Sequence, residues 1–182
     1  MKAKRGEKSR DALRRAKRVR LMIFDVDGVL TDGRLWYGPG GEALKAFSVL
    51  DGHGIKMLMH SGVEVALLSG RDSPAAAARA AEIGIRHALL GIEDKRAAFE
   101  KLLRSLRLAP AEAGFMGDDV VDLPVMRRCG FACAPTTAHR LVAKHAHFIA
   151  GAPAGGGAAR EVCEYLLQAQ GGLDAALAGY LE

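Results

Sequence analysis

Short apolar runs alternate with longer amphipathic stretches along most of the chain. The apolar runs are typical of buried strands, which we predict at 19–25, 63–69, 86–90, 113–117, 130–134 and 146–150. The amphipathic stretches predict helices at 52–61, 73–83, 94–107, 121–128, 137–145 and 158–169. This alternation of strands and helices predicts an α/β fold, a Rossmann-like parallel sheet with helices on both faces.

Segment 34–49 interrupts the alternation and predicts a β-hairpin insertion. Two strand-like stretches, Leu35 to Tyr37 and Ala43 to Val49, flank the turn-forming run Gly38-Pro39-Gly40-Gly41. A two-stranded hairpin is marginally stable alone, so we expect it to pack on the domain or on another subunit. Its aromatic residues, which have no obvious core partner in the sequence, are Trp36, Tyr37 and Phe47.

Composition favours one globular domain. The chain has 182 residues, of which 49% are hydrophobic, enough for a sizeable core. No run of 18 apolar residues is present and no signal-peptide pattern begins the chain, so we expect neither a membrane span nor secretion. The three cysteines, Cys129, Cys133 and Cys163, form no C-x-x-C pair. An odd count without a secretory leader favours reduced thiols and a cytoplasmic location.

Positive charge is concentrated at the N-terminus. The first 20 residues contain ten Lys and Arg and two Asp and Glu, whereas the remainder has 16 basic and 19 acidic residues. We therefore divide the chain into a basic extension, 1–18, and a folded domain, 19–182. The extension could bind nucleic acid, act as a transit peptide, or be a solvated, partly helical arm. The arm is favoured because termini commonly lack fixed structure, and nucleic acid is not expected because no aromatic residues interleave the charges.

The strongest chemical signal is a pair of carboxylates directly after the first strand. Asp25 and Asp27 would project from the carboxyl edge of the sheet, where open α/β sheets bind ligands. One carboxylate can attack phosphorus while the other moves a proton. Turn-forming aspartates would also explain D-x-D alone. The ten-residue string from Phe24 to Gly33, FDVDGVLTDG, is much more specific for this chemistry than D-x-D alone.

This string resembles the nucleophile motif of the haloacid dehalogenase superfamily of phosphohydrolases. Three further motifs of the superfamily follow in order: Val63 to Arg71, a strand ending in a hydroxyl and a glycine; Glu93-Asp94-Lys95, which begins a helix; and the acidic loop Gly117 to Asp122. Taken separately, these residues could be a helix cap, a solvated lysine and a polar turn. Their order from Asp25 to Asp122 favours the functional interpretation.

The resemblance implies a role for each polar residue. Asp25 would be the nucleophile and a Mg²⁺ ligand, and Asp27 would be the general acid and base and would ligate the metal through its backbone carbonyl. Asp118 would complete the ligands from the protein, with Asp119 and Asp122 orienting the metal and its waters. The residues expected to bind the phosphoryl group are Ser69, Gly70 and Lys95.

Motif spacing narrows the resemblance. Only 43 residues separate Asp25 from Ser69, and 25 separate Ser69 from Lys95, which leaves no room for a folded cap domain. From about Val19 to Gly171 the chain resembles the 3-deoxy-D-manno-octulosonate 8-phosphate phosphatases, a capless and tetrameric branch of the superfamily. The motifs that carry this resemblance include Asp51-Gly52-His53-Gly54-Ile55-Lys56 and the loop from Gly155 to Glu161. Ala154 stands where the family has the first glycine of that loop.

This narrower resemblance implies a homotetramer acting on a small sugar-acid phosphate of lipopolysaccharide synthesis. The implied substrate contacts are Asp27, Ser48, Val49, Leu50, Asp51, Gly52, Lys56, Gly70, Arg71, Arg79 and Lys95. Lys56 is a point charge where many relatives have arginine, so it cannot form a bidentate fork. Arg71 and Arg79 could instead be solvated helix residues. A neighbour's C-terminal segment, 171–182, would help to cover the site, although a surface helix would equally explain its apolar residues.

Three alternatives remain open from the sequence. A nine-carbon keto-sugar acid phosphate could be the substrate. A non-catalytic oligomerisation module of the same fold is disfavoured by intact Asp25, Asp27, Lys95 and Asp118. A nucleic-acid-binding protein or polynucleotide phosphatase would depend on the basic extension.

Overall fold

Six parallel strands form the central sheet of the computed structural model, which describes the backbone of residues 2–182 and side chains from residue 9 onwards. Their order is β5-β4-β1-β6-β7-β8. The strands are β1 (Leu21–Phe24), β4 (Glu64–Leu68), β5 (His87–Leu89), β6 (Ala113–Met116), β7 (Phe131–Ala134) and β8 (Phe148–Ile149). All six predicted strands and the parallel α/β fold are confirmed.

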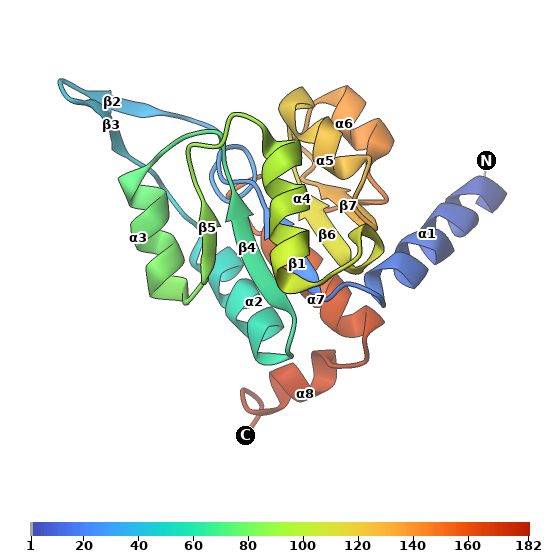
Figure 1. Cartoon of the computed structure of the whole chain (residues 1–182). Helices are drawn as coiled ribbons and strands as arrows, with labels where there is room; N and C mark the ends of the chain where they lie inside the picture. The colour runs from blue at the N-terminus through green and yellow to red at the C-terminus, as the bar shows by residue number, and fades with distance from the viewer. Residues whose placement is uncertain (1) are drawn as a thin grey trace.

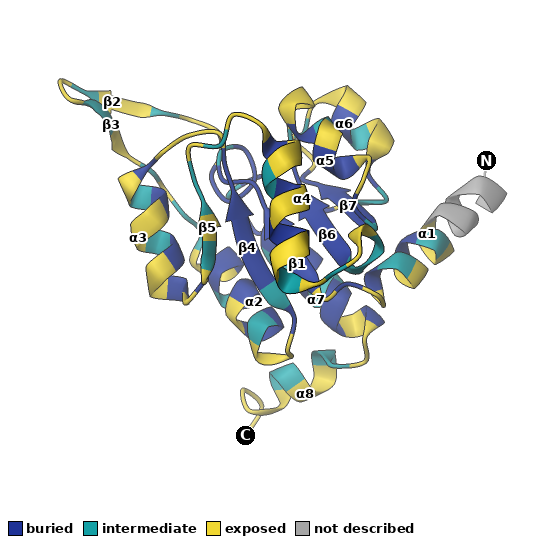
Figure 2. Ribbon diagram, in the orientation of Figure 1, coloured by how far each residue is buried: buried dark blue, intermediate teal, exposed yellow. Residues whose placement is uncertain are grey.

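Helices cover both faces of the sheet (Figure 1). One layer contains α1 (Lys2–Ala16), α2 (Val49–His60), α3 (Pro74–Ile83) and α7 (Ala158–Ala169). The other contains α4 (Lys95–Leu106), α5 (Leu123–Met126) and α6 (Arg140–His145). Successive side chains of a strand point to opposite faces, so one strand contributes to both cores. In β1, Met22 and Phe24 pack with the first layer, whereas Leu21 and Ile23 pack with the second. The buried residues therefore lie on the strands and on the sides of the helices that face the sheet (Figure 2).

Two of the predicted helices begin or divide differently in the structure, and in each a side chain caps the first turn. Helix α2 begins at Val49, not 52, because the Ser48 side chain accepts a hydrogen bond from the backbone N–H of Asp51 at 3.4 Å. The predicted helix at 121–128 divides into a 3₁₀ turn, η2 (Val120–Asp122), and the short α5. Asp119 caps that turn, since its carboxylate accepts a hydrogen bond from Val120 N at 2.7 Å.

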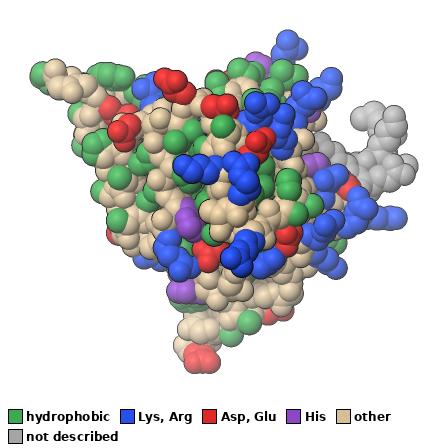
Figure 3. Space-filling view, viewed as in Figure 1, with side chains coloured by type: hydrophobic (Ala, Val, Ile, Leu, Met, Phe, Trp, Pro, Cys, Tyr) green, Lys and Arg blue, Asp and Glu red, His purple; other side chains and the backbone are tan. Residues whose placement is uncertain are grey.

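The predicted hairpin is present as an antiparallel pair, β2 (Trp36–Gly38) and β3 (Gly41–Leu44), outside the main sheet. It projects from the body and exposes hydrophobic side chains (Figures 1 and 3). Trp36 is 58% exposed and Tyr37 67% exposed. Two expectations were wrong: the second strand ends at Leu44 and does not reach Val49, and Phe47 has a partner because it packs against the main core.

Both terminal segments are helical. In the basic extension, Ala12 and Ala16 are buried, and the Gln170 side chain donates hydrogen bonds to Ala16 O at 3.1 Å and Val19 O at 2.9 Å. The second half of α1 therefore packs on the body, while Lys and Arg side chains gather near α1 and α4 in Figure 3. A short 3₁₀ turn, η1 (Pro110–Glu112), precedes β6, and α8 (Leu173–Ala178) lies on the surface near the C-terminus. Within residues 2–182, no helix is long and apolar enough to cross a membrane.

Candidate active site

Four of the predicted site residues meet at the carboxyl edge of the sheet. Asp25 directly follows β1, Ser69 follows β4, Asp118 lies two residues beyond β6, and Lys95 is the first residue of α4. Strand β1 lies between β4 and β6, where the chain order reverses, and such positions are where open α/β sheets bind ligands. An open pocket here is lined by Asp25, Asp27, Gly33, Ser69, Gly70, Arg71, Lys95, Asp118, Asp119 and Val121.

A buried lysine joins two of the carboxylates. The ammonium of Lys95 lies 2.7 Å from Asp122 Oδ1 and 3.0 Å from Asp25 Oδ2, and all three residues are buried. The second oxygen of Asp122 accepts hydrogen bonds from the backbone N–H groups of Asp118 at 3.0 Å and Asp119 at 3.3 Å. Asp122 therefore orients both the lysine and the acidic loop.

Two glycines allow the carboxylates to approach the backbone closely. Gly28 has φ +79°, and a Cβ atom there would lie 2.1 Å from Asp118 Oδ2. A Cβ atom at Gly117 would lie 2.5 Å from Asp122 Oδ2. Neither loop could carry a larger residue without moving a carboxylate.

Burial makes the acidic cluster unfavourable in its ionised form. Burial raises the pKa of Asp25 to about 7, the negative charge of Asp122 adds to this, and Lys95 opposes it. Burial also raises the pKa of Asp118 to about 7, with contributions from Asp122 and Asp25. Desolvation opposes the charge of Lys95, but Asp25 and Asp122 outweigh this and raise its pKa.

The cluster has the donor set of a site for a hard divalent cation. Oxygens of Asp25, Asp118 and Asp122 all lie within 4.8 Å of one another. Asp122 does not line the pocket and both its oxygens already accept hydrogen bonds. Asp25 and Asp118 do line the pocket, so they are the carboxylates that could hold Mg²⁺.

Asp27 lies at the same pocket but has a different partner. Lys45, between β3 and α2, forms an ion pair with Asp27 Oδ1 and a second with Glu42 at 3.0 Å. Arg71 Nε lies 3.8 Å from Asp27 Oδ2. Neither Lys45 nor Glu42 was predicted from the sequence, because the contact joins the hairpin to a loop 18 residues earlier and no periodic pattern records it.

The phosphoryl-binding residues expected from the sequence also reach the pocket. Ser69 is buried, and its hydroxyl oxygen accepts a hydrogen bond from the Arg71 N–H at 3.3 Å. Gly70 and Arg71 follow it along the pocket wall. This arrangement places a hydroxyl and two cations, Lys95 and Arg71, beside the carboxylates.

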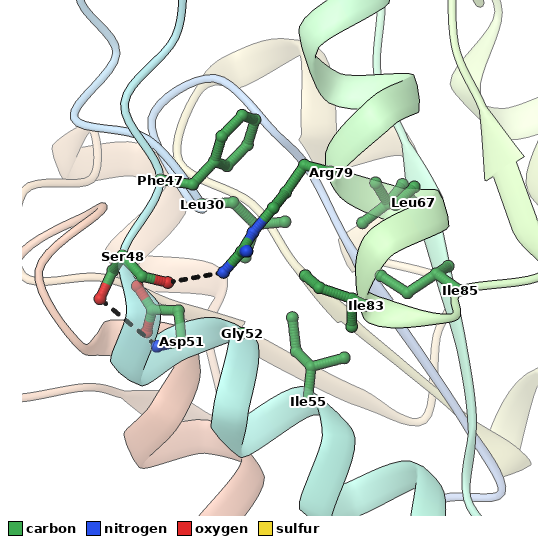
Figure 4. Close-up of a pocket in the computed structure, with 11 residues that line it drawn as sticks. Leu30, Phe47, Ser48, Asp51, Gly52, Ile55, Leu67, Arg79, Ile83 and Ile85 are labelled. Atoms are coloured by element: carbon green, nitrogen blue, oxygen red, sulfur yellow. Dashed lines mark hydrogen bonds between the residues drawn. The ribbon is translucent and has the colours of Figure 1, made fainter.

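The remaining predicted substrate contacts lie elsewhere in the single chain. Ser48, Asp51, Gly52 and Arg79 line a small second pocket, in which the Arg79 side chain extends toward Ser48 (Figure 4). The Arg79 guanidinium donates a hydrogen bond to Ser48 O at 3.3 Å and pairs with Glu82 at 2.8 Å. The residues that are exposed and line neither pocket are Val49, Leu50 and Lys56.

Asp51 has a clear structural partner. Its buried carboxylate accepts hydrogen bonds from Arg160 N at 2.8 Å and Gly157 N at 3.3 Å. It thereby satisfies the free N–H groups at the start of α7. The adjacent loop, where Ala154 replaces a family glycine, is nevertheless well packed, because Ala154 is buried and Gly155 N donates to Val29 O at 3.0 Å.

Comparison with known proteins identifies close relatives. No protein-family model matches the chain. The 3-deoxy-D-manno-octulosonate 8-phosphate phosphatase KdsC of Escherichia coli is 44% identical over 171 residues, which cover 94% of this chain and 91% of that protein. A probable YrbI family phosphatase from Pseudomonas syringae superposes with a TM-score of 0.93 at 48% identity, covering 95% of this chain and 98% of that one.

A third relative was solved with ligands. The 3-deoxy-D-manno-octulosonate 8-phosphate phosphatase of Moraxella catarrhalis, in complex with magnesium, phosphate and KDO, has a TM-score of 0.91 and 36% identity, covering 93% of this chain and 98% of that one. These likenesses extend over nearly the whole chain and agree with the acidic pocket. The chain belongs to the 3-deoxy-D-manno-octulosonate 8-phosphate phosphatase family of the haloacid dehalogenase superfamily.

Proposed function

We propose that the protein hydrolyses 3-deoxy-D-manno-octulosonate 8-phosphate to the free sugar acid and phosphate, with Mg²⁺ as cofactor. The observation that carries this proposal is the pocket in which Asp25, held by Lys95, faces Asp118 and lies near Asp27. The similarity to a relative solved in complex with magnesium, phosphate and KDO supports both the proposed substrate class and Mg²⁺ as the metal.

Asp25 would act as the nucleophile. Its carboxylate oxygen attacks phosphorus, the bond from phosphorus to the sugar oxygen breaks, and the proton of Asp27 passes to that oxygen. An aspartyl-phosphate on Asp25 results. A water molecule then attacks the phosphorus and gives a proton to Asp27, and the acyl phosphate bond breaks to restore Asp25 and release phosphate.

The other pocket residues would bind and orient the phosphoryl group. Lys95 would neutralise charge on it, while the Ser69 hydroxyl and the Gly70 N–H would donate hydrogen bonds to its oxygens. Asp25, Asp118 and the backbone carbonyl of Asp27 would hold Mg²⁺, which screens the repulsion between a phosphate dianion and the attacking carboxylate when it is bound.

The exposed hairpin supports a homotetramer in which neighbouring copies complete the substrate site. Trp36 and its cross-strand partner Leu44 are both exposed, as is Tyr37, and monomers usually avoid exposing apolar side chains together in this way. The predicted contacts outside the pocket, including Lys56 and Arg79, would then reach substrate in the assembled enzyme. We place the reaction in the cytoplasm, in lipopolysaccharide precursor synthesis.

A phosphate-release screen tests this function. The panel contains 3-deoxy-D-manno-octulosonate 8-phosphate, a nine-carbon keto-sugar acid phosphate, and simple hexose phosphates, each with Mg²⁺ and with EDTA. We expect the eight-carbon acid to give the highest kcat/KM, with activity lost in EDTA and in the Asp25→Asn control. A higher kcat/KM for the nine-carbon acid phosphate would mean that this compound, and not the eight-carbon one, is the substrate. No release from any member by the wild type would refute the phosphatase function.

A further inference from the structure

The hairpin reaches back to the active site through one partly buried ion pair. Lys45 lies just beyond β3, and its side chain has no exposed surface. It contacts Asp27 Oδ1 and Glu42, whose other oxygen accepts a hydrogen bond from the Ser73 hydroxyl at 2.6 Å. A continuous polar chain therefore joins Asp27 to the first residue before α3.

The two oxygens of Asp27 have different surroundings. Lys45 holds Oδ1 but does not line the pocket. Oδ2 lies toward Arg71, which does line the pocket, at a looser 3.8 Å. The lysine thus contacts the carboxylate from outside the pocket and leaves the other oxygen on the substrate side.

We propose that Lys45 is a positioning residue for Asp27, which fixes one carboxylate oxygen so that the other can exchange a proton with the substrate oxygen and then with water. This inference rests on the proposed function, because it assigns Asp27 the proton transfers. Lys45 itself touches neither the substrate nor the reacting atoms.

In this proposal Lys45 controls the side-chain geometry of Asp27. Asp27 belongs to a loop that follows β1, and its side chain is partly exposed, so without a partner it could adopt several rotamers. A misplacement of about 1 Å can lower a rate on the order of 100-fold. Two carboxylate partners hold the lysine in turn, Asp27 and Glu42, and the latter is fixed by Ser73.

The test compares three variants on 3-deoxy-D-manno-octulosonate 8-phosphate. Lys45→Met removes the ammonium but keeps the side-chain length. Ser73→Ala removes the hydrogen bond that anchors Glu42 on the hairpin, and the one that Ser73 accepts from Ala76 N at the start of α3, without touching Asp27. Lys101→Met removes an exposed lysine on α4 as a control for charge. Thermal unfolding with Mg²⁺ verifies that each variant is folded.

We expect kcat of Lys45→Met to fall about 10- to 100-fold, with KM changed by less than about two-fold. Lys101→Met should keep kcat within about three-fold of the wild type. Ser73→Ala, which reaches Lys45 only through Glu42, should lose clearly less kcat than Lys45→Met. An equal loss in Ser73→Ala would mean that hairpin docking matters and not the orientation of Asp27. That result, or an unchanged kcat in Lys45→Met, would overturn the inference.

A second readout follows from the leaving group. The leaving group of 4-nitrophenyl phosphate departs without a proton, so its kcat/KM, which reports phosphoryl transfer to Asp25, should fall at least about five-fold less in Lys45→Met than that of the sugar phosphate. Equal losses on both substrates would contradict positioning of the proton donor. A wild type inactive on every phosphate ester would instead refute the proposed function, so the two failures are distinguishable.

Discussion

Substituting Gly28 by alanine should separate metal binding from folding. Gly28 has φ +79°, and a Cβ atom added there would lie 2.1 Å from Asp118 Oδ2 and 2.5 Å from Asp118 Cγ. Real Cβ atoms essentially never approach closer than 3.0 Å, so the carboxylate must move by about 1 Å or the loop must yield. The left-handed backbone adds a cost of about 1–2 kcal/mol for any residue with a Cβ atom.

Gly62→Ala is the matched control. Gly62 also has a positive φ, +93°, but apart from its own chain neighbours no heavy atom lies within 4 Å of the place that its Cβ atom would take. Both variants should lose about 1–2 kcal/mol of unfolding free energy, which corresponds to a Tm lower by about 2–8 °C in a chain of this size. Only Gly28→Ala should also lose Mg²⁺ affinity and about 100-fold in kcat/KM, because only there does a ligand move.

The assay combines thermal unfolding in EDTA with Mg²⁺ titrations of both activity and binding heat. The diagnostic quantity is the Mg²⁺ dissociation constant of Gly28→Ala relative to Gly62→Ala. If the two variants bind Mg²⁺ equally and turn over equally, Asp118 is not the ligand that Gly28 accommodates, and our placement of the metal is incorrect.

Four further outcomes are expected. Asp25→Asn and Asp27→Asn should each remove nearly all turnover while the circular dichroism spectrum stays native; near-normal turnover of the purified Asp25 variant would contradict nucleophilic attack. The folded pKa values of Asp25 and Asp118 are raised to about 7 from 3.8, so the stability that these two groups contribute to the metal-free protein should be fully present below about pH 4 and be lost as pH rises through 7. The Tm gained on adding Mg²⁺ should therefore increase over that range, and a pH-independent gain in calorimetry would count against it. Asp51→Ala should lower the unfolding free energy by about 1–2 kcal/mol in urea titrations, because it removes the cap of α7. Trp36→Asp should dissociate the proposed homotetramer in analytical ultracentrifugation; a wild type that sediments as an active monomer would refute that assembly.

The sequence predicted those parts of the molecule that depend on local patterns. Each strand of the main sheet ends within two residues of its predicted end because short apolar runs bounded by turn residues carry that information. The pocket followed from four motifs, since Asp25, Ser69 and Asp118 each come after a strand and parallel strands bring those ends to one edge.

Contacts between distant segments could not be predicted in this way. No pattern in the sequence indicates that the Asp51 carboxylate caps a helix more than 100 residues later. Lys45 carried no signal at all, because its partner Asp27 becomes its neighbour only when the hairpin folds back. Such pairs depend on tertiary geometry, which neither periodicity nor turn chemistry specifies.

Charge balance explains why this pocket needs a cation. Asp25, Asp118 and Asp122 bring three potential negative charges to within 4.8 Å, while Lys95 supplies one positive charge. Two like charges at that distance repel by about 3–4 kcal/mol at an effective dielectric constant near 20. The raised pKa values of Asp25 and Asp118 are the same repulsion and burial expressed as protonation. In the proposed mechanism a protonated Asp25 could not attack phosphorus. Mg²⁺ held by Asp25 and Asp118 would lower the pKa of both carboxyls and offset the excess negative charge. Asp27 pairs with Lys45 and Asp25 pairs with Lys95, so in the proposed mechanism the proton donor and the nucleophile would have different cationic partners.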